Sequence, residues 1–310
     1  MSNMTRRRFL WHAGCAGAAV TIGLPTRAAW PAAGAPGSSL RLVFYTDVHA
    51  RTEWDTPQGM TLAARAINAE HGDLVIAGGD LITDGFQSAA ATVEPRWEAY
   101  LAMQSAIRAP VEAVLGNHDL VAARPEDGSE ASPDPRHVFR TKLGVDRTWR
   151  RIDAAGYRLL ILDSVDISDD ELQYHGRISD EQLGWLASEL ASTDTDTPIV
   201  VASHIPLLTA MYQATEGATA SAKANRVVVN NLQVLELFSE HNLLLVLQGH
   251  LHIEELLRWQ GTTFITGGAV CGKWWRGPWH GTAEGFGVVT LRPDRVEWEY
   301  RSYGWVAKRP

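Results

Sequence analysis

Five apolar runs in this chain each end in a short cluster of acidic, amide or imidazole side chains. The runs are strand-like in length and cover residues 42–45, 74–77, 111–115, 199–201 and 243–247. Apolar runs of this length, buried on both faces, are typical of strands in a parallel or mixed sheet covered by helices. Side chains just beyond the carboxyl ends of such strands converge on one crevice. The pattern therefore predicts a site as well as a fold.

The polar clusters supply the ligand types of a metal centre. The candidate ligands are two carboxylates, one amide oxygen and four imidazoles: Asp47, His49, Asp80, Asn117, His204, His250 and His252. Oxygen and imidazole ligands without a thiolate favour Mn, Fe, Zn or Co over a closed structural zinc site. Seven ligands are too many for one ion but suit two divalent metal ions that share a carboxylate. Asp80 is the candidate bridge, because the two glycines before it let backbone and metals approach closely.

Helices are predicted where apolar residues recur at helical spacing, over residues 57–68, 94–107, 183–190 and 230–241. Pro95 is expected in the first turn of the second helix. Ser179 is expected to cap the third helix, with Gln182 three residues further on.

Two strand pairs are predicted in the rest of the chain. One joins residues 149–152 to 157–162, and the other joins 288–291 to 296–300 and closes a second sheet. Polar composition predicts exposed loops over residues 121–135 and 208–226. No internal repeat or hinge-like linker interrupts residues 40–310, which are therefore predicted to form one domain.

Residues 1–29 are predicted to be an export signal, followed by a linker over residues 30–39. A charged start, a short apolar middle and small residues before position 29 have the composition of such signals. The arginines at 6–8 followed by Phe9-Leu10 resemble the bacterial twin-arginine signal, which implies transient contact with the twin-arginine export machinery and a periplasmic or secreted protein. An ordinary secretory signal or a disordered basic tail are the alternatives.

Composition and the N-terminus limit the partners. The formal net charge is −8, and removal of residues 1–28 takes away four arginines and no acids, which leaves about −12. An acidic surface disfavours polyanions, so a nucleic-acid polymer is a poor substrate. No apolar stretch reaches the roughly 18–20 residues of a membrane span. His12 also stands where a lipid anchor at Cys15 would need a small apolar residue, so no stable membrane anchor is expected. Cys271 is expected to be a small buried thiol.

The polar clusters together resemble the motifs of the calcineurin-like metallophosphoesterase family. They read D-x-H at 47–49, G-D at 79–80, G-N-H-D at 116–119, His204, and G-H-x-H at 249–252. The resemblance runs from about residue 40 to residue 264. It implies an α/β fold, a four-layer αββα sandwich of two mixed sheets flanked by helices. It also implies a metal-dependent phosphoric ester hydrolase that works by metal-hydroxide attack.

The resemblance also implies a division of roles. The first ion would be held by Asp47, His49, Asp80 and His252, and the second by Asp80, Asn117, His204 and His250. His118 would be a catalytic non-ligand that protonates the leaving oxygen or stabilises transition-state charge, and Asp119 would orient His118 and keep it protonated. Purple acid phosphatases place a tyrosine where this chain has Thr83, so divalent ions are expected. Asp84 is expected to cap a loop.

The substrate is the least constrained feature. Residues 161–164, Gly176 and residues 182–186 resemble the bacterial class III cyclic nucleotide phosphodiesterase branch. This favours a small phosphodiester, either a cyclic nucleotide or a glycerophosphodiester. A phosphomonoesterase, a pyrophosphate hydrolase and a non-catalytic binding scaffold are the alternatives.

A segment rich in glycine and tryptophan follows the last motif, at residues 267–280. Its candidate substrate-binding residues are Lys273, Trp274, Trp275 and Arg276. The indoles could stack on a base or an apolar leaving group, and the cations could meet a non-bridging phosphate oxygen. The alternative is a glycine-rich turn whose indoles only close the edge of the sandwich.

Overall fold

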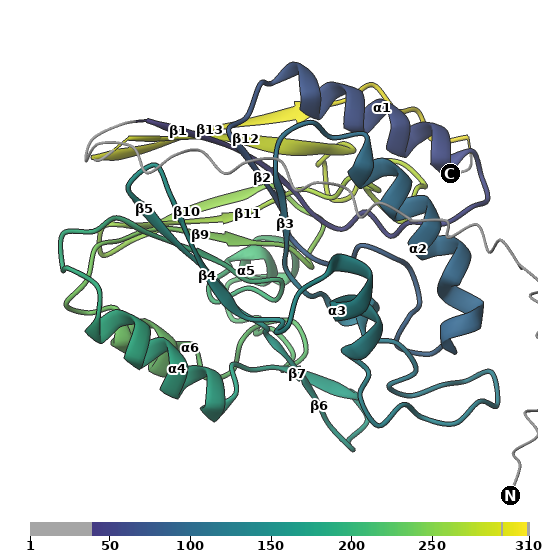
Figure 1. Ribbon diagram of the computed structural model, residues 1–310, viewed down its shortest axis with the longest axis horizontal. Helices are drawn as coiled ribbons and strands as arrows, with labels where there is room; N and C mark the ends of the chain where they lie inside the picture. Colours follow the sequence, from purple (N-terminus) through teal and green to yellow (C-terminus); the bar gives the residue numbers. More distant parts are fainter. Residues whose placement is uncertain (1–38, 293, 309–310) are drawn as a thin grey trace, which may run out of the picture.

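Two mixed β-sheets face each other through the middle of the protein (Figure 1), in a computed structural model that describes residues 39–292 and 294–308. The first sheet has the strand order β13 (Arg295–Ser302), β12 (Gly285–Arg292), β1 (Leu40–Tyr45), β2 (Leu74–Ala77), β3 (Val111–Ala113). The second has the order β10 (Glu255–Trp259), β11 (Thr262–Thr266), β9 (Leu243–Gln248), β8 (Ile199–Ala202), β5 (Tyr157–Ile161), β4 (Arg150–Ala154). The predicted export signal lies outside the described residues.

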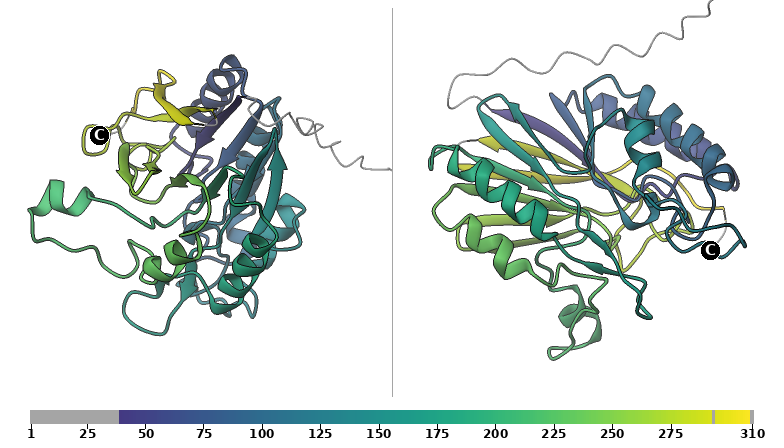
Figure 2. Two further views of the ribbon diagram at one scale, coloured as in Figure 1. Left: turned by 90° about the vertical axis from the view of Figure 1, so that its left-hand side faces the viewer. Right: turned by 60° about the horizontal axis from the view of Figure 1, so that its bottom comes forward.

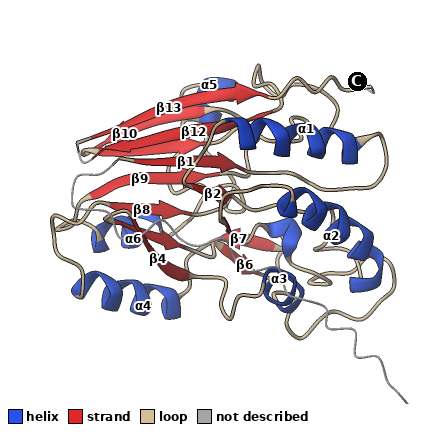
Figure 3. Ribbon diagram, turned by 45° about the horizontal axis from the view of Figure 1, so that its top comes forward, coloured by secondary structure: helices blue, strands red, loops and turns tan. Residues whose placement is uncertain are grey.

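Helices flank both sheets, as Figures 1 and 3 show. The first sheet is accompanied by α1 (Thr56–Ala69) and α2 (Ala90–Ser105), and the second by α4 (Asp180–Ala191) and α6 (Asn231–Leu237). Two further helices, α3 (His137–Leu143) and α5 (Met211–Glu216), a short 3₁₀ helix η1 (Asn117–Asp119), and a small hairpin of β6 (Val165–Ile167) and β7 (Tyr174–Gly176) complete the described part. This arrangement confirms the predicted α/β class with two mixed sheets flanked by helices.

Alternate residues of β1 pack on opposite faces of the first sheet, one toward the second sheet and the other toward the helices. Leu42 and Phe44 pack between the sheets, in a cluster that also contains Val200 of β8. Val43 and Tyr45 belong to the cluster that contains the buried side chains of the helices. Every second residue of a strand points to the same face, so a continuous apolar run is what a strand between two apolar layers requires.

The carboxyl ends of the inner strands bring the polar clusters together. β1, β2 and β3 run parallel to one another in the first sheet, and β8 and β9 run parallel in the second. The clusters therefore come from two facing sheets. The C-terminal strands do not close a second sheet as predicted, because β12 pairs antiparallel with β1 and extends the first sheet. This pairing covers an edge that would otherwise leave the backbone groups of β1 without partners.

Several element boundaries differ from the predictions. Pro95 lies inside α2 because the helix begins at Ala90, where Asp127 Oδ2 accepts a hydrogen bond from Ala89 N–H at 3.0 Å. The last predicted helix ends at Leu237. The predicted loop 208–226 contains α5, which projects from the body of the protein in both views of Figure 2.

The other predicted elements agree with the structure, except that the first three residues of the predicted exposed loop 121–135 are buried. The Ser179 cap is confirmed, since its Oγ accepts a hydrogen bond from Gln182 N–H at 3.3 Å. In the described residues, no helix has the length and apolar character needed to cross a bilayer. That residues 40–310 form one domain stays a prediction.

Substitution of Phe44 should test the packing between the sheets. Its ring is 1% exposed, so Phe44→Ala is expected to lower the free energy of unfolding by about 3–5 kcal/mol, measured by chemical denaturation. Leu232→Ala on α6, where the side chain is 76% exposed, should change it by less than about 0.5 kcal/mol. Equal effects of the two changes would contradict the described core.

Candidate functional site

The carboxylate of Asp80 lies at the centre of the predicted ligand set. Its Oδ2 is 3.2 Å from His204 Nε2 and 3.5 Å from His49 Nε2. Its Oδ1 accepts a hydrogen bond from His118 N–H at 2.8 Å. The side chain is 2% exposed. One buried carboxylate oxygen therefore faces imidazoles from both predicted ligand groups, which is the geometry that a bridging ligand needs.

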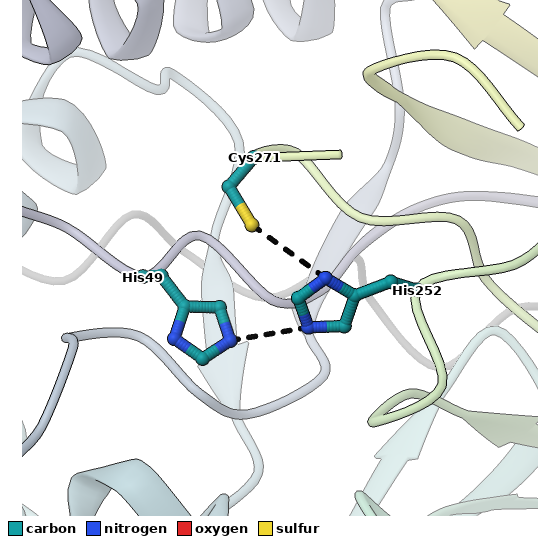
Figure 4. Close-up of side chains that lie close together, drawn as sticks. All are labelled: His49, His252 and Cys271. Atoms are coloured by element: carbon teal, nitrogen blue, oxygen red, sulfur yellow. Dashed lines mark hydrogen bonds between the residues drawn. The ribbon is translucent and has the colours of Figure 1, made fainter. Parts of the chain in front are cut away.

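The first ligand group gathers on one side of Asp80. His252 Nε2 lies 3.2 Å from Asp47 Oδ1 and 3.2 Å from His49 Nε2. Figure 4 shows the rings of His49 and His252 with these nitrogens facing each other. All three side chains are buried. Two imidazole nitrogens and a carboxylate oxygen thus converge within the spacing of ligands around one cation.

The second group contains buried atoms that make no hydrogen bond. The rings of His204 and His250 lie 5.1 Å apart, and both residues group with Asp80 as a potential metal site. Asn117 Oδ1 is buried and makes no hydrogen bond within the described protein, and His204 Nε2 meets only the criterion of an ion pair, with Asp80 Oδ2 at 3.2 Å. Buried polar atoms normally have a partner, and a cation would satisfy both of these lone pairs. The residues present therefore fit a second ion.

Backbone carbonyls fix the tautomer of three imidazoles. Each of these rings donates one N–H to a carbonyl oxygen: His204 Nδ1 to Gly78 at 2.8 Å, His252 Nδ1 to Gly272 at 2.6 Å, and His250 Nε2 to Asn225 at 3.0 Å. A carbonyl can only accept, so the opposite nitrogen of each neutral ring keeps its lone pair. This arrangement is typical of histidines that bind metals.

Most of the predicted ligands have a left-handed backbone. Five of the seven have φ between 44° and 71°: Asp47, His49, Asp80, His250 and His252. Positive φ is uncommon outside glycine, and such strain concentrates at functional sites. These conformations occur in the turns that follow the strands, and they orient the five side chains toward the ligand cluster around Asp80.

Close backbone approach explains the glycines of the motifs. A Cβ at Gly116 would lie 2.1 Å from the backbone nitrogen of Asp80, and one at Gly249 would lie 2.3 Å from Thr46 Oγ1. Neither position can hold a larger residue without moving a candidate ligand. The loops that carry these ligands therefore pack directly on one another.

The carboxyl groups of Asp47 and Asp80 are held in the anionic form. Burial alone would raise the pKa of Asp47, but the charges of His252 and His204 outweigh it and lower this pKa to about 2. Burial also acts to raise the pKa of Asp80, but the charge of His204 helps to hold this pKa well below its ordinary value. Anionic carboxylates are the form that binds a cation.

The imidazoles divide into two types. Burial, together with neighbouring imidazole charge, lowers the pKa of His49 and of His250 well below the ordinary value. Burial also acts to lower the pKa of His204, but the charge of Asp80 raises it to about 9. Metal ligation requires a neutral imidazole, so a cation at His204 would displace a proton.

The environment of His118 differs in part from the prediction. His118 Nδ1 accepts a hydrogen bond from Asp84 N–H at 3.1 Å, so the neutral ring carries its proton on Nε2. The prediction that Asp119 orients this ring does not match the contacts, since both of its oxygens accept from backbone amides, at 2.7 Å from Leu81 and at 2.8 Å from Gly116. Asp119 instead joins the loop after β2 to the loop after β3, and its catalytic assignment stays a prediction.

The predicted substrate-binding residues separate into different environments. Trp275 is 2% exposed, and its indole N–H donates to the carbonyl of Val48 at 3.0 Å, so it supports the turn before His49 and is not open to a substrate. Trp274 is partly exposed and lies beside His252, with 4.7 Å between ring centroids. Lys273 and Arg276 are exposed.

Two features near the site were not predicted. Cys271 is buried as expected, but its Sγ also lies 3.8 Å from His252 Nδ1, on the side of the ring away from His49 (Figure 4). Arg226 Nη1 lies 3.5 Å from His250 Nε2. Arg226 makes no ion pair with any described carboxylate, which leaves a half-buried positive charge at the rim. Neither residue belongs to a motif, so the sequence carries no signal for them.

A curated protein of named activity is similar in sequence to this chain. The chain is 25% identical over 243 residues to the cyclic AMP phosphodiesterase CpdA of Escherichia coli, an alignment that covers 75% of this chain and 76% of that protein.

Solved structures share the fold. A dimetal phosphatase from Danio rerio matches with a TM-score of 0.61 and 17% identity, over 85% of this chain and 96% of that one. The purple acid phosphatase PPD1 of yellow lupin matches with a TM-score of 0.60 and 18% identity, over 88% of this chain and 53% of that one.

The family model for calcineurin-like phosphoesterases matches residues 40–254, which contain all of the predicted metal ligands and His118. The family depends on two metal ions, and the His and Asp groups described above provide potential metal sites in this chain. This chain belongs to the calcineurin-like phosphoesterase family and is a metallophosphoesterase.

Proposed function

We propose that this protein is an exported hydrolase of a small phosphodiester, with two divalent ions held around Asp80. The observation that carries the proposal is the position of Asp80 Oδ2, which faces His49 and His204 at 3.5 Å and 3.2 Å. His118, which is not among the proposed ligands, lies at the edge of the same cluster, 4.6 Å from His49 between ring centroids. Ligands for two cations and a separate proton donor are the parts that such a hydrolase needs.

The proposed ligands form two sets that share Asp80. One ion would be held by Asp47, His49, Asp80 and His252, and the other by Asp80, Asn117, His204 and His250. When bound, two such ions lower the pKa of a shared water and neutralise charge on the phosphoryl group. The buried lone pairs of Asn117 and His204 support the second set.

Loss of one ligand should reduce metal content and activity together. His250→Ala is expected to lower the metal measured by elemental analysis from two ions per chain toward one. It should also lower kcat/KM by roughly 100-fold or more. Loss of a residue that only hydrogen-bonds a metal ligand already lowers metal affinity or activity by about 10–100-fold.

His71→Ala provides the control, because that histidine is exposed and outside the site. Full activity in the His250 variant would remove the two-metal proposal.

The proposed role of His118 follows from its hydrogen bonds. Its backbone N–H holds Asp80 Oδ1, and its Nδ1 accepts from Asp84 N–H. The ring is thereby fixed with its Nε2–H free to donate to the leaving oxygen or to the developing charge on the phosphoryl group. A shallow depression of about 460 Å³ adjoins His118 and is lined also by Gln87, Ser88 and the carboxylates of Asp84, Glu126 and Asp127.

Removal of this ring should separate chemistry from metal binding. His118→Ala is expected to keep both ions and to lower kcat by about 10²–10⁴-fold, the usual worth of a proton donor. Esters with acidic leaving groups should recover part of the loss, because they need no proton. If metal content falls along with activity, His118 belongs among the ligands.

The diester assignment rests on likeness to CpdA and on the sequence motifs of the branch. A panel of cyclic nucleotides, glycerophosphodiesters, monoesters and pyrophosphates, assayed with metal-quantified protein, tests it directly. One observation favours the second candidate, a phosphomonoesterase or pyrophosphate hydrolase. The unpaired charge of Arg226 would suit a more anionic phosphoryl group. Turnover of p-nitrophenyl phosphate far above that of its bis-ester would decide for that candidate.

Export by the twin-arginine route is proposed from residues outside the described part of the chain. Replacement of Arg6 and Arg7 by lysine should keep the protein in the cytoplasm, detected by fractionation and immunoblotting. The same double change leaves the charge unaltered, so any loss of export reports on the arginines themselves. Unchanged export would favour an ordinary secretory signal.

A further inference from the structure

Two indoles continue the wall of the site away from the first ligand group. The ring centroid of Trp274 lies 4.7 Å from that of His252 and 6.1 Å from that of His49. Trp279 meets Trp274 edge to face at 5.9 Å. Both tryptophans are partly exposed, and the indole N–H of Trp274 has no hydrogen-bond partner among the described residues. An aromatic surface therefore begins at the proposed metal ligands and extends toward solvent.

The loop holds Trp274 in this position at a conformational cost. Trp274 and Trp275 have φ of 48° and 66°, two successive left-handed residues with bulky side chains. Such strain persists only where the surroundings enforce it. Trp275 provides the anchor, since its indole N–H donates to the carbonyl oxygens of Val48 and His49 at 3.0 Å and 3.1 Å.

The neighbouring tryptophans perform different tasks. Trp275 is buried against Trp305, at 5.6 Å between centroids, and closes the structure behind the turn that carries His49. Trp274 is not needed for that closure, because it faces the ligands and solvent. The alternative of a purely structural turn therefore describes Trp275 and leaves Trp274 unexplained.

Positive charge accompanies the aromatic surface. Lys273 Nζ lies 5.3 Å from the centre of the Trp279 ring, within the range of a cation–π contact. The contact places an ammonium group beside the two indoles. Flat aromatic faces next to a cation suit a ligand that combines an aromatic ring with an anionic phosphate.

We propose that Trp274, supported by Trp279, binds an aromatic ring of the ester group and so determines specificity for nucleotide-like phosphodiesters. The proposal rests on the proposed function of the site as a phosphodiesterase. An aromatic ring can stack on an exposed indole whatever its hydrogen-bonding pattern. A glycerol-type ester offers no flat face and gains nothing from this contact. The surface therefore discriminates between the two diester classes that the sequence leaves open.

The test compares an aromatic with an aliphatic substrate in matched variants. Trp274→Leu keeps bulk but removes the aromatic face, Trp274→Phe keeps an aromatic face, and Trp259→Leu is the control at a tryptophan that is 58% exposed on β10. We expect Trp274→Leu to lower kcat/KM for cyclic AMP by roughly ten-fold or more while changing that for glycerophosphoethanolamine by less than about two-fold. Trp274→Phe and Trp259→Leu should stay close to wild type.

A binding measurement gives a readout independent of turnover. Isothermal titration of the metal-loaded protein should show a Kd for AMP that rises roughly ten-fold in Trp274→Leu, with metal content and the Kd for glycerophosphate unchanged. Equal losses for both substrates, or a loss of metal in Trp274→Leu, would overturn the proposal and make Trp274 a packing partner of His252. Wild-type protein that hydrolyses no diester would instead refute the proposed function, whatever the variants bind.

Discussion

The buried carboxylate of Asp80 is the interaction on which the site depends. It lies in the loop after β2 of the first sheet, yet its Oδ2 faces His204, which follows β8 of the second sheet. Burying a charged group away from water is costly unless cations or donors surround it. Here three imidazoles lie near it and a backbone N–H binds it. The charge of Asp80 is therefore compensated only when the two sheets face each other as they do here.

Backbone amides couple the loops to the carboxylates. His250 N–H donates to Asp47 at 3.0 Å, and His118 N–H donates to Asp80 at 2.8 Å. Each carboxylate is thus fixed by the turn that carries a neighbouring functional residue. The left-handed conformations at Asp47, Asp80 and His250 are stabilised by these contacts. Strain and hydrogen bonding together orient the ligands, which lowers the ordering cost of binding a cation.

The strands and the candidate ligands could be predicted because both have local signals. The apolar run at 74–77 and the G-D motif after it identify β2 and Asp80 without knowledge of the rest of the chain. Pairing between distant segments has no such signal, so the position of β12 beside β1 was predicted incorrectly. Composition also could not separate Trp274 from Trp275, because adjacent residues of one type take opposite roles once the turn fixes their directions. Asp119 and Arg226 depend on contacts between loops in the same way.

We propose that the carboxylate of Asp80 joins two metal ions in a single protein chain. Electron paramagnetic resonance of the protein loaded with Mn²⁺ tests it most directly. A bridging Asp80 predicts two Mn²⁺ per chain with the multiline signal of an exchange-coupled pair, and loss of that coupling in Asp80→Ala. Two uncoupled Mn²⁺ ions in the wild type, or coupling that survives without the Asp80 carboxylate, would show that Asp80 does not bridge the ions.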